Sequence, residues 1–493
     1  MERIIRINEN DTVAVAITQL ECGERLMLGT DTLQVKGTIP AGHKIALCDV
    51  EQGAAVVKYG FSIGYAKQNI ERGTWVHTHN LRTGLGDVAE YRYNPQLPSE
   101  TKKKEACFYG YDRGNNKIGV RNEIWIIPTV GCVNNVAVAL AEQAKQFKTG
   151  NIDAVVAFPH PYGCSQMGDD QEYTRRFLAN LIQHPNAGGV LVLGLGCENS
   201  NISELKKYIG SYDAERVKFL VCQECADEME AGLECVKTLI QTAASDERSR
   251  VSASHLVVGL KCGGSDGFSG ITANPLVGRF SDRLIAAGGT TILTEVPEMF
   301  GAETILMNRC RDEQVFEQTV DLINDFKKYF TEHGQTIYEN PSPGNKAGGI
   351  STLEDKSLGC TQKAGTAVVN GVIAYADTVK EKGLNLLSAP GNDLVAASAL
   401  AVAGAQIVLF TTGRGTPFAS PIPTIKIASN SKLAGQKRHW IDFDAGILLE
   451  GDSMEDTEEQ FFDYVLQVAS GKLVSSEEAG FHDMAIFKQG VTL

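Results

Sequence analysis

The sequence predicts an α/β protein with a small, mostly β N-terminal domain and two following α/β domains whose sheets are mainly parallel. Three observations predict this. Residues 1–95 hold short apolar runs broken by turns about every ten residues. From Ile124 onward, strand-like apolar runs alternate with helix-like segments, a rhythm typical of parallel sheets. Polar, glycine-bearing loops follow several of these runs, at the carboxyl ends of strands where α/β proteins bind ligands.

Changes in composition indicate where one domain ends and the next begins. We assign the β domain to residues 1–95 and a linker, QLPSETKKKEA, to residues 96–106, because proline, serine and a lysine run are typical of linkers. The first α/β domain is expected at residues 107–245. The polar segment ASDERSR (244–250) then separates it from the second α/β domain, expected to be catalytic, at residues 250–493.

Charge and cysteine content restrict the classes of function. The 493 residues carry 46 Lys and Arg against 60 Asp and Glu, a formal net charge of −14. Such a field repels nucleic acid and anionic membrane surfaces, so we expect neither as a partner. The first residues lack the apolar core of a signal peptide, and the most apolar window (394–410) reads as a buried helix followed by a strand. Twelve cysteines at low density indicate reduced thiols, so we expect a cytoplasmic protein.

One glycine-rich stretch is expected to form a wall of the active site. Residues 259–275, GLKCGGSDGFSGITANP, follow an apolar run and contain five glycines with short polar side chains between them. The alternative is a surface turn. Repetition favours the site, because the same pattern recurs at residues 158–170, 194–201, 344–349 and 358–365. Several such loops at strand ends predict a shared cleft.

Cysteines in these loops are candidate metal ligands. Cys164, Cys197, Cys262 and Cys360 each lie in one of the glycine-bearing loops, and Glu198 follows Cys197. Converging thiolates and carboxylates would favour iron or zinc over magnesium. The alternative is that each cysteine is a small buried apolar residue.

Three histidines stand out by their neighbours. His160 lies between two prolines, which fix the backbone and can aim a catalytic base or a ligand. His77 and His79 are two residues apart in VHTHN, so on a strand both would point to one face. They could bind a metal or an anion, or could simply form a polar strand end.

Charged residues in the loops supply candidates for acid–base chemistry and for anion binding. Glu295 and Glu298 end the strand-like TTILTEVPE and could act as acid and base, bind a cation, or cap a helix. Arg414 has glycines on both sides in TTGRGTP and could clamp a carboxylate, as could Lys346. Lys261 is a candidate base if its pKa is depressed. The alternative for each cation is a solvated surface charge.

Motifs along nearly the whole chain can be read together: GVRNEIWIIPTVGCVN, HPYGCSQMGDD, GLGCENSN, CGGSDGFSGITANP, TEVPEMFGAE, NPSPGNKAGGISTLEDKSLGCTQKAG, APGND and TTGRGTP. In these motifs the chain resembles the altronate dehydratase and galactarate dehydratase family of bacterial sugar-acid catabolism. The first 95 residues, with VHTHN, are similar to the β-clip domain called SAF that heads members of this family.

The resemblance implies a hydro-lyase that removes water from D-altronate to give 2-dehydro-3-deoxy-D-gluconate, with Fe²⁺ or Mn²⁺ as cofactor. Galactarate or another sugar acid is the alternative substrate. An iron–sulfur dehydratase and a sugar-acid sensor without catalysis are the alternative functions. We expect a small-molecule sugar-acid substrate and a homodimer.

We assign roles in this chemistry to the candidates as hypotheses. The proposed catalytic residues are His160, Lys261 and Glu298. The proposed metal ligands are His77, His79, Cys164, Cys197, Glu198 and Cys262. The proposed substrate-binding residues are Arg414 and Lys346 for the carboxylate, with Asp266, Asn274 and Asn392 for the rest of the sugar acid.

Overall fold

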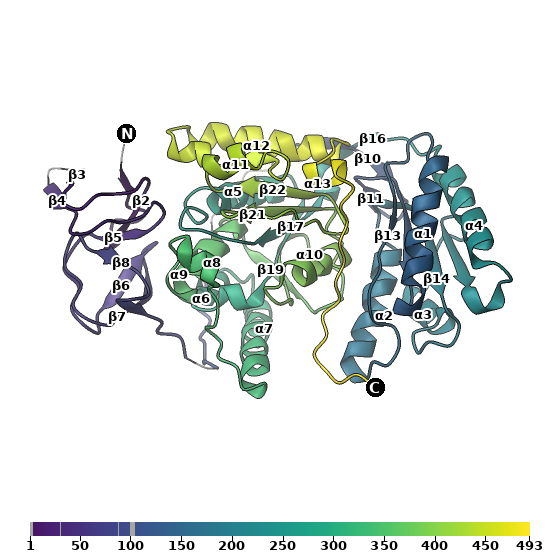
Figure 1. The fold of residues 1–493 in the computed structure, drawn as a ribbon, viewed down its shortest axis with the longest axis horizontal. Coiled ribbons are helices and arrows are strands. Elements are labelled where there is room, and N and C mark those ends of the chain that lie inside the picture. Colours follow the sequence, from purple (N-terminus) through teal and green to yellow (C-terminus); the bar gives the residue numbers. More distant parts are fainter. Residues whose placement is uncertain (1–2, 30, 87, 99–103) are drawn as a thin grey trace.

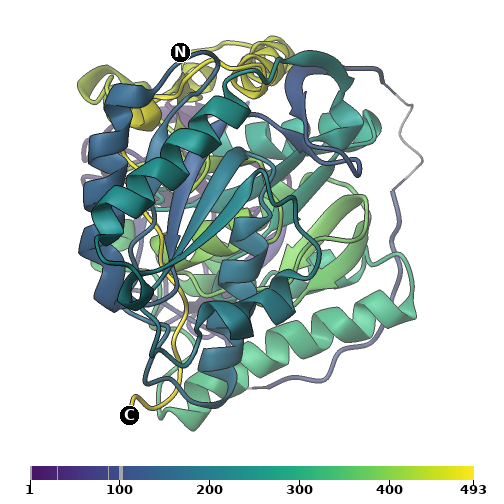
Figure 2. The ribbon, with the colours of Figure 1, turned by 90° about the vertical axis from the view of Figure 1, so that its right-hand side faces the viewer.

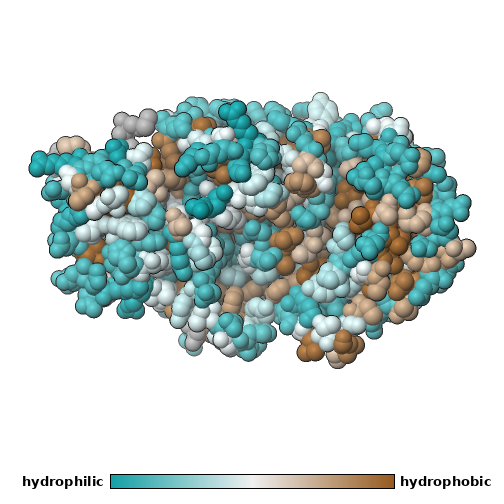
Figure 3. All heavy atoms as spheres, viewed as in Figure 1, coloured by the Kyte–Doolittle hydropathy of each residue, from teal (hydrophilic) through white to brown (hydrophobic). Residues whose placement is uncertain are grey.

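A computed structural model describes residues 3–29, 31–86, 88–98 and 104–493, which form three domains arranged along the long axis of the molecule (Figure 1). The N-terminal domain lies at one end and the second domain at the other. The C-terminal domain lies between them. On the face shown in Figure 3, hydrophilic residues cover most of the N-terminal domain, and hydrophobic patches gather toward the second domain.

The N-terminal domain consists of short antiparallel strands. Four of them form a sheet in the order β1-β2-β5-β8, three form β6-β7-β9, and β3 pairs with β4. The strands are β1 (Ile4–Ile5), β2 (Val13–Ala16), β3 (Arg25–Leu28), β4 (Asp31–Gln34), β5 (Lys44–Ala46), β6 (Ala55–Lys58), β7 (Phe61–Ala66), β8 (Trp75–Val76) and β9 (Leu81–Arg82). The predicted mostly β character is confirmed.

The second domain contains a four-stranded parallel sheet in the order β13-β12-β14-β15. Alternate residues of β12 point to opposite faces. Ile124 and Ile126 pack in a core with α1 and α4, whereas Trp125 and Ile127 pack in a core with α2 and α3. Figure 2 shows helices on both faces of this sheet. The elements are β12 (Glu123–Pro128), α1 (Asn134–Ala144), β13 (Val155–Ala157), α2 (Gly168–Ile182), β14 (Ala187–Gly194), α3 (Ile202–Ile209), β15 (Val217–Val221) and α4 (Glu228–Ala243), with 3-10 turns η1 (Gly131–Val133), η2 (Lys145–Phe147) and η3 (Cys222–Glu224).

The C-terminal domain contains a seven-stranded parallel sheet in the order β19-β20-β18-β17-β21-β22-β23. The strands are β17 (Val257–Cys262), β18 (Thr290–Leu293), β19 (Val369–Ile373), β20 (Gly383–Leu387), β21 (Ile407–Thr412), β22 (Thr424–Ala428) and β23 (Phe443–Asp444). The α-helices are α5 (Ala273–Ala286), α6 (Glu303–Met307), α7 (Glu313–Glu332), α8 (Pro343–Ala347), α9 (Leu353–Cys360), α10 (Asp393–Val402), α11 (Ser431–Gln436), α12 (Met454–Ala469) and α13 (Ser475–Glu478). The 3-10 turns are η4 (Ala253–His255), η5 (Val296–Met299), η6 (Thr361–Ala364) and η7 (Gly446–Leu449). The helix and strand predicted within residues 394–410 are confirmed as α10 and β21.

The second and C-terminal domains are joined in several places. Strand β10 (Cys107–Asp112) pairs with β11 (Ile118–Gly119) and with β16 (Ser249–Ser252) in a small antiparallel sheet. The extended C-terminal segment runs past α10 to α2 (Figure 1), where the Asp170 carboxylate accepts hydrogen bonds from the amides of Gln489 and Gly490. Among the described residues, no helix combines the length and apolar composition needed to span a bilayer.

Candidate functional site

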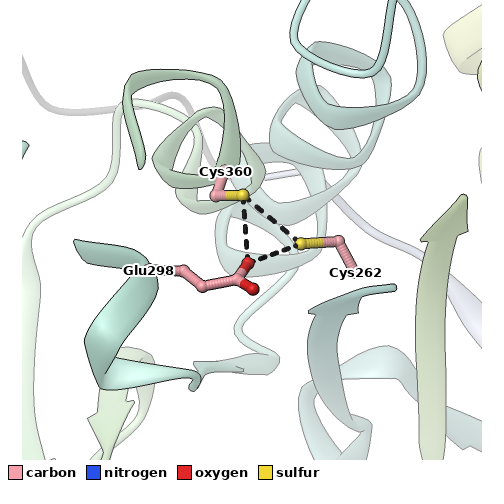
Figure 4. A group of neighbouring side chains, drawn as sticks. All are labelled: Cys262, Glu298 and Cys360. Atoms are coloured by element: carbon pink, nitrogen blue, oxygen red, sulfur yellow. Dashed lines mark hydrogen bonds between the residues drawn. The ribbon is translucent and has the colours of Figure 1, made fainter. Parts of the chain in front are cut away.

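Two thiols and a carboxylate meet at the carboxyl edge of the large sheet. Cys262 is the last residue of β17, Glu298 lies in η5 after β18, and Cys360 ends α9, and all three side chains point toward one another (Figure 4). Glu298 Oε2 lies 3.1 Å from Cys262 Sγ and 3.2 Å from Cys360 Sγ, within hydrogen-bonding distance of both sulfurs. The two sulfurs are 3.4 Å apart. We call these three residues the Cys262 group.

Three buried lysines compensate the negative charge around this group. Lys261 Nζ lies 2.7 Å from Glu295 and 2.8 Å from Asp393, and Lys356 Nζ lies 2.7 Å from Glu298. Lys363 Nζ is 3.9 Å from Glu295, and both side chains are about 1% exposed. A buried charge is costly unless it is paired. Each of these lysines is accordingly close to at least one carboxylate.

The hydrogen bond between the two thiols makes them chemically unequal. It combines with the ammonium groups of Lys363 and Lys356 to lower the pKa of Cys262 to about 6, although burial acts in the opposite direction. The same pairing, together with burial, raises the pKa of Cys360. At neutral pH the pair therefore holds one thiolate, the form that binds metals and acts as a nucleophile.

The two glutamates also differ. Burial would raise the pKa of Glu298, but Lys356 and Lys363 lower it to about 2, so Glu298 is ionised. Burial and the negative charges of Cys262 and Glu298 raise the pKa of Glu295 well above its usual value. Glu295 also has a left-handed backbone with φ of 67°, which is rare for a residue other than glycine, and its carboxylate accepts a hydrogen bond from Cys262 N. Such strained residues cluster at functional sites.

The N-terminal domain is bound to the C-terminal domain beside this edge. Asp355 of α9 lies between two lysines of the N-terminal domain, 2.7 Å from Lys44 and 3.0 Å from Lys58, and all three side chains are almost completely buried. His77 Nδ1 contacts Ser351 Oγ at 3.1 Å, in the loop before α9. The N-terminal domain thereby brings an imidazole to the helix that ends in Cys360.

The predicted histidine pair is wrong in its geometry. Strand β8 ends at Val76, and His77 and His79 lie in the following turn, where Asn80 Oδ1 accepts a hydrogen bond from His77 N. His77 is buried, whereas His79 is exposed beside Trp75. The two rings therefore do not share one strand face.

The structure does not support His160 as the base. His160 Nε2 contacts Pro128 O at 2.8 Å, and Nδ1 accepts a hydrogen bond from Tyr162 N. Burial lowers its pKa to about 4, so the ring is neutral at neutral pH, and it is the occupied nitrogens that argue against a base. Both ring nitrogens are therefore occupied by the backbone of the second domain, one at the end of β12 and one in the loop after β13. The C-terminal domain lies between this domain and the N-terminal domain (Figure 1).

The predicted set of six metal ligands does not form one site. In the part of the chain that the structure describes, the Cys262 group is the one set of three or more histidine, cysteine or carboxylate ligands within 4.8 Å of one another. Cys164 and Cys197 are exposed on the second domain. Glu198 is buried there, and the Thr129 hydroxyl and the Gly196 amide donate to its carboxylate. Burial would raise the pKa of Glu198, but these hydrogen bonds lower it.

A lysine base with a depressed pKa is also contradicted. Burial opposes the charged form of Lys261, but Glu295 and Asp393 outweigh it and raise its pKa above the usual value. Lys261 therefore remains an ammonium group at neutral pH. A positive charge fixed at this edge can stabilise an anion, but it cannot accept a proton.

The five predicted substrate-binding residues fall into two kinds. Asp266 accepts hydrogen bonds from Ser269, Ser429 and Asn430, and Asn274 bonds Gly359 O and the Thr411 hydroxyl, so both are held within the protein. The other three are accessible. They are Arg414 after β21, half-buried Lys346 on α8, and Asn392 at the N-cap of α10.

Sequence reasoning assigned no role to several residues that surround the group. Asp355 and Lys356 lie on α9 about one turn before Cys360. His43 Nδ1 accepts a hydrogen bond from Trp75 Nε1, and its Nε2 contacts Ala347 O. A lysine and an aspartate on a short helix look like surface residues in a sequence. A weak signal was present, because STLEDKSLGC follows a glycine-bearing loop and has few apolar positions for a buried helix.

The Cys262 group fits a divalent transition metal. Two thiols and a carboxylate combine soft and hard ligands, a set that suits Fe²⁺ better than Mn²⁺, which prefers oxygen. The hydroxyls of Ser265 and Ser357 are buried next to this edge, and neither has a hydrogen-bond partner among the described residues. Unsatisfied buried hydroxyls are expected where a ligand is missing.

A cavity lies elsewhere, mainly in the C-terminal domain, away from the Cys262 group. It has a volume of about 460 Å³ and is lined by α2, α7, β19 and the C-terminal segment, including Asp321, Tyr329 and Tyr375. It contains no cysteine or histidine. The concentration of thiols, carboxylates and lysines therefore identifies the functional site better than cavity size does.

Fold and site together define a multidomain α/β enzyme with a buried thiol–carboxylate centre at the carboxyl edge of a parallel sheet. Comparison with family models is more specific. Residues 253–492 match the C-terminal domain of D-galactarate/altronate dehydratase, residues 110–244 match the second domain of D-galactarate dehydratase/altronate hydrolase, and residues 2–84 match the altronate/galactarate dehydratase SAF domain. The chain belongs to this family of dehydratases, and its N-terminal domain is a SAF domain.

Full-length relatives agree with the family models. The chain is 55% identical to an altronate dehydratase of Bacillus subtilis over 100% of both chains. It is 53% identical to an altronate dehydratase of Escherichia coli over 99% of both chains. It is 32% identical to a galactarate dehydratase (L-threo-forming) of Escherichia coli over 98% of this chain and 96% of the relative. The chain is thus much more similar in sequence to these two altronate dehydratases than to this galactarate dehydratase.

Proposed function

We propose that the protein dehydrates D-altronate to 2-dehydro-3-deoxy-D-gluconate and water, at the edge of the C-terminal sheet that holds the Cys262 group. The observation that carries this proposal is a buried thiolate and carboxylate among three lysines, in a chain that aligns over its full length with two altronate dehydratases. Removing a proton next to a carboxylate creates an anion, and such an anion needs fixed positive charge.

The proposal includes a divalent metal held by Cys262, Cys360 and Glu298, with Fe²⁺ favoured over Mn²⁺ by the donor set. When bound, such an ion acts as a Lewis acid on the oxygens of the sugar acid. Lys356, in contact with Glu298, and Lys363 retain their charge because buried carboxylates and thiols raise their pKa above the usual value, although burial alone would lower it. Both ammonium groups would stabilise negative charge on the substrate carboxylate.

We propose His77 in place of His160 as the group that takes the proton. Its Nδ1 contacts Ser351 Oγ, and among the described residues no hydrogen bond reaches its Nε2. Burial, with nearby Lys44, lowers the pKa of His77 to about 4, so the imidazole is neutral at neutral pH and can accept a proton. His79 and the SAF domain would then form one wall of the cleft.

Arg414 and Lys346 remain the proposed partners of the substrate carboxylate. Arg414 N donates to Gly264 O, in the loop that follows Cys262, so the backbone of Arg414 lies against this loop and its side chain is exposed. Lys346 lies on α8, where the neighbouring Asn345 donates to Ser265 O. A guanidinium can hold a carboxylate through two parallel hydrogen bonds.

Further proposals concern the protein in its cell. All twelve cysteines are free, which supports a reducing compartment such as the cytoplasm. We also propose a homodimer, the commonest symmetric assembly, and no nucleic-acid partner because of the charge of −14. Light scattering of the purified protein would test the dimer.

The substrate and the metal are tested together by turnover of chelator-stripped protein on a panel of aldonic and aldaric acids. We expect a 2-keto-3-deoxy product from D-altronate only after Fe²⁺ or Mn²⁺ is restored, with little product from galactarate. Product from galactarate alone would contradict the substrate. Full turnover after chelation, with no metal detected in the protein, would contradict the metal.

The proton acceptor is tested with His77→Gln. We expect kcat to fall by about 100-fold or more, because general base catalysis contributes roughly 10² to 10⁴. His333→Gln at the exposed end of α7 is the matched control and should keep wild-type turnover. Normal turnover of His77→Gln, with His160→Gln inactive and folded, would return the role to His160.

A further inference from the structure

A second set of thiols lies at the carboxyl edge of the other parallel sheet. In the second domain, Cys132 follows β12, Cys164 follows β13 and Cys197 follows β14, each directly after a glycine. All three are exposed, and the Cys262 group does not include them. The sheet order β13-β12-β14-β15 reverses between β12 and β14, the position where open α/β sheets bind ligands.

Backbone contacts bring the three loops together. Gly131 N donates to Tyr162 O and Ser200 N donates to Gly163 O, each at 3.0 Å. A Cβ on Gly163 would lie 1.9 Å from Thr129 O, so glycine is required for this approach. The Cys164 loop is therefore held between the Cys132 loop and the Cys197 loop.

Side chains continue this arrangement around the sulfurs. Cys164 Sγ donates to Asn199 Oδ1 at 3.3 Å, and Asn199 lies two residues after Cys197 in the Cys197 loop. Gln223 Nε2 donates to Cys197 Sγ at 3.6 Å. The sulfurs of Cys164 and Cys197 are thus bordered by amide groups on one edge of the domain.

Two buried polar groups at these loops have unused hydrogen-bonding capacity. Gln166 is 3% exposed and is turned toward the Cys164 loop, because its Oε1 accepts from Gly163 N. Its Nε2 has no partner among the described residues, and the same holds for the hydroxyl of fully buried Ser200. Such groups are expected to have a partner, so they point to a ligand at this edge.

We propose that Cys132, Cys164 and Cys197 hold an iron–sulfur cluster. Sulfurs that bind one ion at about 2.3 Å can be at most about 4.6 Å apart. These three are not within 4.8 Å of one another in the described part of the chain, so a single ion does not fit them. A cluster places its irons at separate corners and is held by thiolates. With three protein thiolates, one iron of a four-iron cluster keeps a position open to solvent.

The test uses the full chain, reconstituted without oxygen with ferrous iron, ferric iron and sulfide, so that both oxidation states of a mixed-valence cluster are supplied, and then desalted. We expect iron and acid-labile sulfide in equal amounts, broad visible absorbance and an electron paramagnetic resonance signal after reduction. The triple variant Cys132→Ser/Cys164→Ser/Cys197→Ser should lose the sulfide and the absorbance. Cys22→Ser/Cys48→Ser, which removes exposed thiols of the SAF domain, is the matched control and should keep both.

Equal sulfide in the triple variant, or iron without sulfide in the wild type, would overturn the cluster. Alkylation of the loaded wild type gives a second test that needs no variant. Cys132, Cys164 and Cys197 should be protected while Cys22 and Cys48 react, and equal labelling of all five would overturn the proposal. Dehydration of D-altronate is assayed separately, so its failure would leave the sulfide and absorbance results unaffected.

Discussion

The second and C-terminal domains both bring cysteines to the carboxyl edge of a parallel sheet, but they surround them differently. Cys262 and Cys360 are 1% and 4% exposed and lie among lysines and glutamates. Cys164 and Cys197 are exposed and bordered by neutral amides. The comparison teaches that strand topology selects the position of a thiol, whereas burial and neighbouring charge decide its chemistry.

The largest expected effect concerns Glu298, the carboxylate that contacts the thiols at the edge of the C-terminal sheet. Glu298→Gln removes the charge that contacts both thiols and Lys356, and we expect kcat on D-altronate to fall by roughly 100- to 1000-fold, as for loss of one preorganised electrostatic group. Steady-state kinetics measure it. Glu332→Gln at the exposed end of α7 should behave as the wild type. Equal turnover in both variants would remove Glu298 from the site.

The next effect is on stability and concerns the SAF domain. Asp355→Asn leaves Lys44 and Lys58 buried without their carboxylate, and breaking a buried pair costs about 3–5 kcal/mol. Urea unfolding should show this loss, and limited proteolysis should cleave the SAF domain faster. The exposed control Asp321→Asn should unfold like the wild type. An unchanged midpoint for Asp355→Asn would show that the lysines find other partners.

Acid should destabilise the second domain through its buried histidines. Burial lowers the pKa of His160 and of His184 to about 4, whereas an unfolded imidazole has a pKa of about 6.5. Between these values the unfolded chain binds more protons, so stability falls as pH falls from about 6.5 to 4. At the acid end of this window, each histidine lowers the free energy of unfolding by up to about 3 kcal/mol.

Urea midpoints at pH 7 and at pH 5 measure this dependence. The difference between them should shrink in folded His184→Gln. His482, whose pKa Glu123 raises although burial opposes it, acts in the opposite direction. Midpoints that do not change between pH 7 and pH 5 would contradict the account.

The smallest expected effect is a difference in alkylation rate between the two sets of thiols. In the metal-free protein, iodoacetamide should label exposed Cys132, Cys164 and Cys197 before buried Cys262 and Cys360, because buried thiols react only when the structure opens. Mass spectrometry after short exposure measures the order. Prior labelling of Cys262 would show that its edge is open to solution.

Much of this arrangement could be predicted from the sequence, and the failures have physical causes. The strand and helix rhythm depends on local patterns. The same holds for the expectation that Cys262, in the loop 259–275, and Glu298, at the end of TTILTEVPE, are site residues, and their roles stay predictions. The strand assumed for His77 and His79 was wrong, because Asn80 closes a turn two residues after β8 begins. His160 looked like a base, since the hydrogen bonds that occupy both its nitrogens come from the backbone and leave no trace in the sequence.

Partners from distant segments were the hardest to predict. Lys44 and Lys58 of the SAF domain meet Asp355 across roughly three hundred residues of chain, and a sequence pattern does not report such a contact. Four loop cysteines were expected in one cleft. They lie in two domains, because glycine-bearing loops with a cysteine occur at the edges of both parallel sheets, with Cys360 at the end of a helix.

A metal at the Cys262 group is tested most directly by the metal dependence of turnover in Cys360→Ser, compared with Cys48→Ser on the surface of the SAF domain. Dehydration of D-altronate would be measured as Fe²⁺ is titrated into each chelator-stripped protein. Loss of a ligand should raise the Fe²⁺ concentration for half-maximal turnover by at least about tenfold, since even indirect supports of a metal site are worth 10- to 100-fold. The same half-maximal concentration in both variants would contradict a metal at the Cys262 group.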